Sequence, residues 1–391
     1  MKKEYILTDL GVRANCRSLQ TKEIQAVLDL CGEQGGTVIV PSGRFYTASL
    51  YLHSNTTLYF ARGAELYGSD DCDDYEIYPI PEGMAFRSDM EMIPQQYNGR
   101  PWEAYRRAIL TAYGERNISI IGENGSVIDG ANCYDPNGEE GYRGPHAIFL
   151  SCCENVLLEG YTVQNSGNFL HEANNCRDLT MRRVTCLGGS DGIHLHCTEN
   201  ALIEDCIFKT GDDCIAGINI RNMTVRRCTL NTSCSLFRMG GTGILVEDCM
   251  AYGPGYYPHR VTVVRGRNEE LPREMGRHNM LSVVEYFASD TYPSENATEI
   301  CIRNCVIDGA KRLVNYYADD SKRLHSGTYF KSLTLENVRL LELEKASCPM
   351  AAENVPLTIV LKNVSYTFRE GTTDQKLIEN GESSHVHVME I

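Results

Sequence analysis

A short pattern repeats five times between residues 156 and 250, and it decides the fold. Its copies read VLLEGYTV (156–163), LTMRRVTC (179–186), ALIEDCIF (201–208), MTVRRCTL (223–230) and GILVEDCM (243–250). In each copy apolar and polar residues alternate, which is the period of a strand with one buried face. The equivalent apolar positions, separated by 23, 22, 22 and 21 residues, are Tyr161, Val184, Cys206, Cys228 and Cys249.

A step of about 22 residues indicates one coil of a β-solenoid. A leucine-rich repeat has a similar period, but its regularly spaced leucines and asparagines are missing here. A doubly wound α/β fold needs helices between its strands, and the intervening segments are too short and too polar for them. We therefore predict an all-β chain, a right-handed single-stranded parallel β-helix that forms one domain over residues 1–391.

Three segments depart from the repeat. Residues 21–33 have helical periodicity and end before Gly35-Gly36. Because the open end of a solenoid needs a cover, we predict an N-terminal capping helix there. Residues 69–107 and 251–297 break the period, and we predict that both are loop excursions beside the cleft.

The 17 cysteines could form disulfides, a metal site or a buried stack. Four of them, Cys206, Cys228, Cys249 and Cys305, fall at one position of the repeat, and no CxxC pair supports zinc. Cysteine is among the most buried residue types, so we predict a stack of buried thiols. The odd count, and a start (MKKEYILTDLGVRANC) without the pattern of a leader, predict free thiols and a cytoplasmic location.

The charge balance excludes some partners. The chain has 52 acidic and 37 basic residues, a net charge of −15. Nucleic acids need a basic surface, so we do not expect them as partners. Nor does the sequence contain an apolar run of about 18 residues that would predict a membrane span.

Equal offsets within the repeat become columns on a stacked solenoid, and two polar columns emerge. Seven residues past the reference position lie Asn168, Asp191, Asp213, Ser235 and Tyr256. Ten residues past it lie His171, His194, Ala216, Arg238 and His259. The position nine past is apolar in most coils, so we expect it inside and the two polar columns together on an outer face.

Aspartates on this face predict acid–base chemistry. Asp191 and Asp213 fall on adjacent coils, and Gly211 permits a bend that could turn Asp212 toward them. Clustered carboxylates repel one another and raise at least one pKa, as glycoside hydrolysis requires. Two other interpretations stay open, ordinary turn chemistry at Asp-Gly and Gly-Asp-Asp, and a calcium-dependent lyase with Arg238 as its base.

Further residues are candidates for substrate binding. We predict that His171 and His194 contact sugar hydroxyls or a carboxylate. Arg238 would either bind a substrate carboxylate or pair with Asp213. Tyr256 could stack on a sugar ring, and Glu285, in the second excursion, is a possible lid contact.

Residues 20–250 resemble the polygalacturonase family, glycoside hydrolase family 28. The most specific stretch is SDGIHLHCTENALIEDCIFKTGDDCIA (190–216), which is similar to the family's Asn-Thr-Asp-Gly and Gly-Asp-Asp-Cys motifs at the family's spacing. The resemblance implies a parallel β-helix and an inverting mechanism. It makes Asp212 the general acid, with Asp191 and Asp213 activating the water.

The chain also departs from the family. Gly189 stands where the Asn-Thr-Asp motif begins, and no histidine of a Gly-His-Gly motif occurs near Ser233–Ser235. The Arg-Ile-Lys motif that grips the substrate carboxylate is missing, and the nearest basic residues are His259 and Arg260. The acid–base residues are thus kept and the recognition residues changed.

We therefore predict inverting hydrolysis of a glycosidic bond in a pectin-related or other plant-cell-wall oligosaccharide, without ordinary endo-polygalacturonase activity. No cofactor and no metal are expected. The alternatives are a β-helix lyase or isomerase that uses the same cleft, and a non-catalytic carbohydrate-binding relative.

Overall fold

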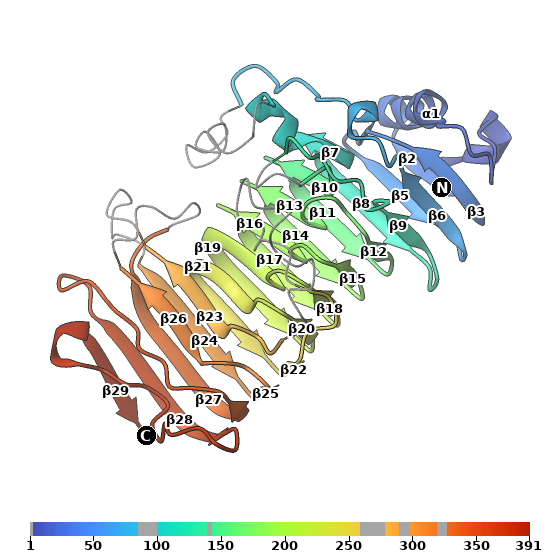
Figure 1. Ribbon diagram of the computed structural model, residues 1–391. Coiled ribbons are helices and arrows are strands. Elements are labelled where there is room, and N and C mark those ends of the chain that lie inside the picture. Colours follow the sequence, from blue (N-terminus) through green and yellow to red (C-terminus); the bar gives the residue numbers. More distant parts are fainter. Residues whose placement is uncertain (1–2, 85–99, 139–142, 259–277, 289–296, 319–326) are drawn as a thin grey trace. The chain divides into compact units, whose positions relative to one another are not determined.

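The computed structural model describes residues 3–84, 100–138, 143–258, 278–288, 297–318 and 327–391 (Figure 1). Almost every regular element is a strand, and the strand ladders are parallel. The predicted parallel β-helix is therefore confirmed. The described residues fall into two compact units, one ending at Ile193 and one beginning at His194.

The first unit contains three ladders of parallel strands, named A, B and C in the order in which the chain passes through them in each coil. Ladder A joins β1 (Glu4–Ile6), β2 (Gly36–Val40), β5 (Thr56–Phe60), β8 (Arg116–Gly122), β11 (Glu154–Glu159) and β14 (Arg177–Arg182). Ladder B joins β3 (Gly43–Thr47), β6 (Ala64–Gly68), β9 (Val127–Asp129), β12 (Thr162–Gln164) and β15 (Thr185–Gly188). Ladder C joins β4 (Leu50–Tyr51), β7 (Ala108–Tyr113), β10 (His146–Ser151) and β13 (His171–Asn174).

The second unit repeats this plan. Its ladder A joins β17 (Glu199–Glu204), β19 (Ile215–Arg226), β21 (Ser235–Glu247), β24 (Thr298–Arg303), β27 (Phe330–Leu343), β28 (Leu357–Phe368) and β29 (Val386–Glu390). Ladder B joins β18 (Ile207–Thr210), β20 (Thr229–Thr232), β22 (Met250–Tyr252) and β25 (Val306–Asp308), and continues into β27. Ladder C joins the first residues of β19 and β21 to β23 (Ser282–Phe287) and β26 (Val314–Tyr317). One further strand, β16 (Ile193–His196), begins at the boundary residue.

The predicted capping helix is present as α1 (Thr21–Gln34), which lies beside the N-terminal strands (Figure 1). Its apolar face is buried against β2 and β4, among other strands, through Ile24, Val27, Leu28 and Cys31. This face removes the first coil's apolar edge from water, which is the favourable term that holds the helix in place.

The predicted interior column exists within each unit. In the first unit Tyr161 and Val184 are buried, and the Thr185 N–H donates to the Tyr161 carbonyl at 3.0 Å. In the second unit the Met250 N–H donates to the Cys228 carbonyl at 3.0 Å, so successive coils place cysteines above one another.

The cysteine column is a stack of thiols. The backbone N–H of Cys228 lies 3.5 Å from the Cys249 sulfur, and the N–H of Cys249 lies 3.4 Å from the Cys305 sulfur. Each sulfur also bonds a carbonyl two residues before it, as Cys206 does to Glu204 at 3.2 Å. These contacts and the burial of all four side chains confirm the predicted stack, and the structure contains the 17 cysteines as free thiols.

Asparagines recur at the bend between ladders A and B within successive coils. Asn304, Asn337 and Asn363 have positive φ, between 50° and 54°, and their side chains form a coil-to-coil chain of hydrogen bonds of 3.1 and 2.8 Å. Asparagine tolerates the left-handed conformation and also supplies both a donor and an acceptor. The same turn can therefore recur in each coil without an unpaired amide.

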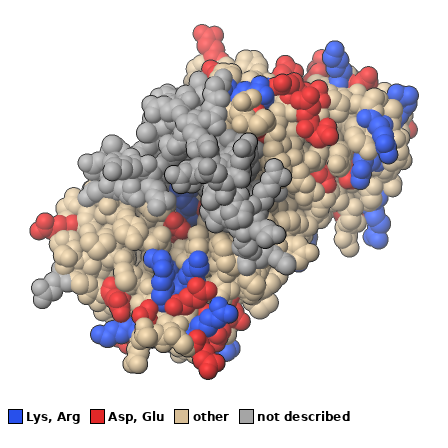
Figure 2. Space-filling model, viewed as in Figure 1, with Lys and Arg blue, Asp and Glu red and all other residues tan. Residues whose placement is uncertain are grey.

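Charged side chains pair across coils on the outer surface of ladder A. Arg226 lies 2.7 Å from Glu204, and Lys331 lies 2.9 Å from Glu299. Figure 2 shows both signs of charge intermixed on the face that it views. In the described part of the chain, no helix has the length and apolarity that crossing a membrane requires.

The first predicted excursion lies between β6 and β7, as its predicted bounds require, whereas the second is smaller than expected. Residues 69–107 contain the short helices η2 (Cys72–Asp74) and η4 (Trp102–Arg106) before β7 begins. Residues 251–297 include the end of β22 and all of β23, which pairs with β21 and β26 as part of a coil. The sequence repeat therefore resumes at Ser282, within the stretch predicted as a loop.

We predict that Gly217→Ala destabilises the fold by at least about 2 kcal/mol, since an unrelaxed backbone clash belongs to the most damaging class of substitution. Gly217 has φ of +143°, and a Cβ there would lie 1.8 Å from the Leu195 carbonyl oxygen. Gly381→Ala is the matched control, because no atom lies within 4 Å of its Cβ position. Urea unfolding measures both variants. Equal midpoints would contradict the close coil-to-coil approach at Gly217.

Candidate active site

Two adjacent carboxylates lie in the turn between β18 and β19. Asp212 is 6% exposed and Asp213 is 2% exposed. The hydroxyls of Thr210 and Thr232 donate to the Asp212 carbonyl, and the Asp213 N–H donates to Asp212 Oδ1 at 3.1 Å. The Ser235 N–H donates to Asp213 Oδ1 at 3.0 Å. The turn thus fixes both side chains on one short piece of backbone.

Burial of this pair changes its protonation. Burial, and then the neighbouring Asp212, raise the pKa of Asp213 to about 7, while the Arg238 guanidinium acts in the opposite direction. Two carboxyls this close do not both ionise readily, so they share one proton near neutral pH. Such a shared proton is what a general acid needs.

A cysteine completes this cluster. The ligand atoms of Asp212, Asp213 and Cys234 all lie within 4.8 Å of one another. Burial and the nearby carboxylates raise the pKa of the Cys234 thiol well above its usual value, which favours the protonated thiol beside the acidic pair. The chemistry of these groups fits a shared proton better than a bound cation.

Arg238 lies beside the acidic pair. Its Nε is 4.0 Å from Asp213 Oδ2, at the outer limit of an ion pair, and its guanidinium lies over the Phe287 ring, 5.6 Å from the centroid. The side chain is 20% exposed. Arg238 is paired with Ala216 in the strand register, so the ten-past column of the second unit is confirmed as far as these two residues.

The next coil changes both predicted columns. Ser282 pairs with Ser235, and Val284 pairs with Phe237. In this register Glu285 lies beside Arg238, one coil further on. The Ser235 hydroxyl donates to Glu285 Oε2 at 2.6 Å, and the Ser282 hydroxyl lies 3.4 Å from the same oxygen.

The predicted place of Tyr256 in the seven-past column is therefore wrong, because Ser282 takes that position and the extra residues precede the strand instead of following it. Tyr256 is 56% exposed, with the Lys209 ammonium 5.1 Å from its ring centroid. His259 and Arg260 lie outside the described residues.

His171 was predicted to contact substrate, and this is also wrong. Its ring nitrogens bond the Tyr161 hydroxyl and the Gly192 carbonyl, both at 2.9 Å, in the coil interior. The Leu170 N–H donates to the Asp191 carbonyl, which sets a step of 22 residues here although the step at Tyr161 is 23. The turn between β15 and β16 is therefore one residue shorter than the turn between β12 and β13. Because of this difference His171 occupies an inward-facing position of its strand.

The same shift affects Asn168. It is buried, and its side-chain amide lies 3.4 Å from His146 and 3.5 Å from Arg143. It therefore does not share a column position with Asp191, which is buried in the first unit at the end of the turn before β16.

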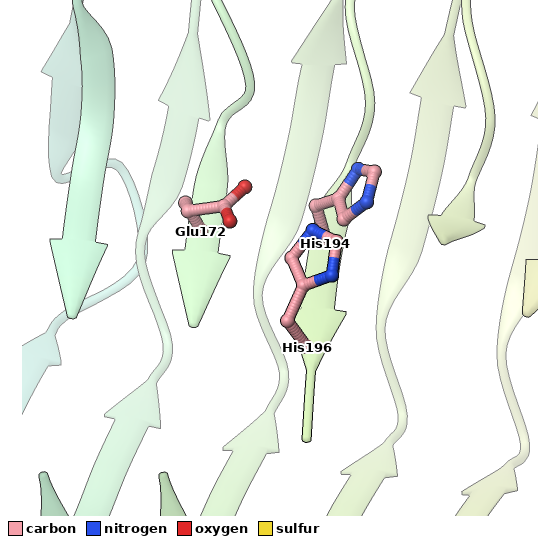
Figure 3. A group of neighbouring side chains, drawn as sticks. All are labelled: Glu172, His194 and His196. Carbon is pink, nitrogen blue, oxygen red and sulfur yellow. The ribbon is translucent and has the colours of Figure 1, made fainter. Parts of the chain in front are cut away.

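His194 and His196 both lie on β16 in the second unit. Figure 3 shows their imidazole rings, and Glu172 on β13 of the first unit. The two rings stack with centroids 4.5 Å apart and an angle of 23° between their planes, and both residues are buried. The substrate contact proposed for His194 stays a prediction.

The sequence predicted Glu285 only as a possible lid contact and indicated no role for Ser282 or Cys234. A sequence signal for Ser282 and Glu285 exists. The stretch SVVEYF (282–287) has strand composition and follows a long polar segment. Aligning it with SLFRMG (235–240) would have placed Glu285 beside Arg238.

Comparisons with known proteins give the same family as the sequence motifs. A family model, glycosyl hydrolases family 28, matches residues 99–236, which include the acidic pair. A probable polygalacturonase of Vitis vinifera is 26% identical over 248 residues, 57% of this chain and 48% of that protein. An exo-poly-alpha-D-galacturonosidase of Dickeya chrysanthemi is 24% identical over 54% of this chain and 41% of its own length. The chain thus matches less than half the length of these two relatives.

A solved structure shares the fold over almost all of the chain. The family 28 exopolygalacturonase of Yersinia enterocolitica has a TM-score of 0.63 at 17% identity and covers 99% of this chain and 78% of that one. At this identity the likeness concerns the fold alone. The match at residues 99–236 confirms the predicted resemblance to glycosyl hydrolases family 28 for that part of the chain, and the solved structure confirms the fold.

Proposed function

We propose that the protein hydrolyses a glycosidic bond by an inverting mechanism. The observation that supports this most is the buried Asp212–Asp213 pair, in which burial and the adjacent carboxyl raise the pKa of Asp213 to about 7, inside the segment that matches family 28. A lone surface carboxyl would be ionised at this pH and could not donate a proton to a leaving group.

In this mechanism Asp212 protonates the glycosidic oxygen as the bond to the anomeric carbon breaks. A water molecule attacks that carbon from the opposite face and gives its proton to a carboxylate. Asp213, held by the Ser235 N–H, accepts this proton together with Asp191. The role of Asp191 rests on the family resemblance.

The proposed substrate is a pectin-related or other plant-cell-wall oligosaccharide. The names of the relatives, polygalacturonase and exo-poly-alpha-D-galacturonosidase, support the pectin class. Ser235 and Glu285 stand near the acidic pair without a histidine, and this departure supports a substrate other than that of an ordinary endo-polygalacturonase. Seventeen free thiols support the cytoplasm as the proposed location.

Asp212→Asn should reduce turnover by at least about 10³-fold, because it removes the proton donor and almost no volume. Release of reducing ends from a panel of cell-wall oligosaccharides measures this. Glu299→Gln is the matched control, a carboxyl at 46% side-chain exposure on the outer surface of the same unit, and it should retain full activity. Full turnover by Asp212→Asn would rule out the assignment.

The first-formed product should have the anomeric configuration opposite to that of the substrate, since one displacement by water inverts the carbon. Proton NMR during the first minutes of hydrolysis, before mutarotation, distinguishes the anomers. Retained configuration would exclude this mechanism, and an unsaturated product absorbing in the ultraviolet would show a lyase instead.

Turnover should fall as pH rises through about 7, because the pair then loses its shared proton. Arg238 lowers and Glu285 raises the pKa of Asp213. The alkaline limb of the kcat profile should therefore move to higher pH in Arg238→Met and to lower pH in Glu285→Gln. Glu299→Gln should leave it in place. Shifts of the same sign in the first two variants would contradict the assignment.

A further inference from the structure

A column of polar side chains continues from the acidic pair across the following coils of the second unit. Arg238 pairs with Ala216, Glu285 follows Arg238, and Asn315 pairs with Glu285. Arg238, Glu285 and Asn315 are all partly exposed, whereas the neighbouring Ser235 and Ser282 are buried. The column therefore presents a guanidinium, a carboxylate and an amide to a ligand beside the acidic pair.

Two serines fix the Glu285 carboxylate and leave one of its oxygens able to accept further hydrogen bonds. The hydroxyls of Ser235 and Ser282 both reach its Oε2. A carboxylate accepts about four hydrogen bonds, so the lone pairs of Oε1 can receive a donor from a ligand. Glu285 is thus a fixed acceptor, with its side chain positioned by two buried serines.

Arg238 is positioned by a different contact. Phe287 lies on the same strand as Glu285, and its ring supports the guanidinium of Arg238. A planar guanidinium has donors only, and a carboxylate has acceptors only. Side by side they match a sugar hydroxyl pair, because each hydroxyl can both accept and donate.

The charges here oppose an anionic ligand. Among the described residues next to Arg238 (+1), the acidic pair with one shared proton carries about −1 and Glu285 adds −1, while the Arg312 guanidinium lies one coil further on and donates to Asn315 Oδ1 at 3.2 Å. A uronate carboxylate bound at Arg238 would add a further negative charge beside Glu285 and Asp213, in partly buried surroundings where charge interactions are strong. The net charge of −15 on the chain adds to this repulsion.

We propose that Arg238 and Glu285 form a subsite for the hydroxyls of an uncharged sugar residue and exclude a uronate from that position. This inference rests on the proposed function in one respect, that a sugar binds beside Asp212 and Asp213. It narrows the substrate to an oligosaccharide with a neutral residue at the position contacting β21 and β23.

Two disaccharides that differ only at C6 test the subsite. Calorimetric titration of the Asp212→Asn protein with α-1,4-galactobiose and α-1,4-digalacturonate measures binding without turnover. Galactobiose should bind at least about tenfold tighter, the scale of a charge-assisted hydrogen bond together with avoided repulsion. The fully methyl-esterified digalacturonate, which is uncharged, should recover part of this affinity.

Adding Glu285→Gln should weaken galactobiose about tenfold and strengthen digalacturonate, because an acceptor and a negative charge disappear together. Glu299→Gln should change neither affinity. Glu285→Asp, which keeps the charge but shortens its reach, should weaken galactobiose without strengthening digalacturonate. It also serves as the second variant if Glu285→Gln does not give a cooperative thermal transition.

Tighter binding of digalacturonate, a ratio of affinities unchanged by both Glu285 variants, or binding of neither disaccharide would each overturn the subsite. These outcomes differ from failure of the proposed function. If the protein hydrolyses oligosaccharides and its substrate preference does not depend on Glu285, only the proposed subsite is wrong. A protein with the expected binding ratio and no hydrolysis would lose the proposed activity alone.

Discussion

The hydrogen bonds between successive coils are the constraint on which the rest of the molecule depends. Parallel strands about 4.8 Å apart must exchange every backbone donor and acceptor with the coils before and after them. The chain satisfies this with a step close to 22 residues and with left-handed turns at residues such as Asn337 and Asn363. Because side-chain columns follow from the step, thiols, asparagines and ion pairs each align with their own kind from coil to coil.

The same constraint produces the acidic pair. The turn between β18 and β19 is closed by the Thr210 and Thr232 hydroxyls and by the Ser235 N–H of the next coil. These contacts hold Asp212 and Asp213 in a buried position that the free chain would avoid, since burial disfavours two charges. The unfavourable free energy of burying two charges raises the pKa of Asp213 to about 7. The stacking of the surrounding coils keeps the pair buried in spite of this cost.

Much of this followed from the sequence because a repeat reports its own register. The cysteine column and the capping helix depend on periodicity alone, and both were predicted correctly. The errors arose where counting crosses a turn of altered length. The turn before His171 is one residue longer than the matching turn before β16, and this difference made an expected ligand contact an interior side chain. The strand that resumes at Ser282 gives that serine the column position predicted for Tyr256. A period of two makes any single-residue slip reverse the face of a side chain.

Glu285 links acid strength to ligand choice through a single charge. Its carboxylate raises the pKa of Asp213, which helps the pair to retain a proton at neutral pH, and the same charge opposes a uronate beside Arg238. A cation in its place would attract the uronate and lower the pKa of Asp213, so less of the pair would carry a proton at neutral pH unless another group compensated. Recognition and proton donation at this site therefore cannot change independently. A change of substrate charge at β23 carries with it a change in the pH range over which the acidic pair can act.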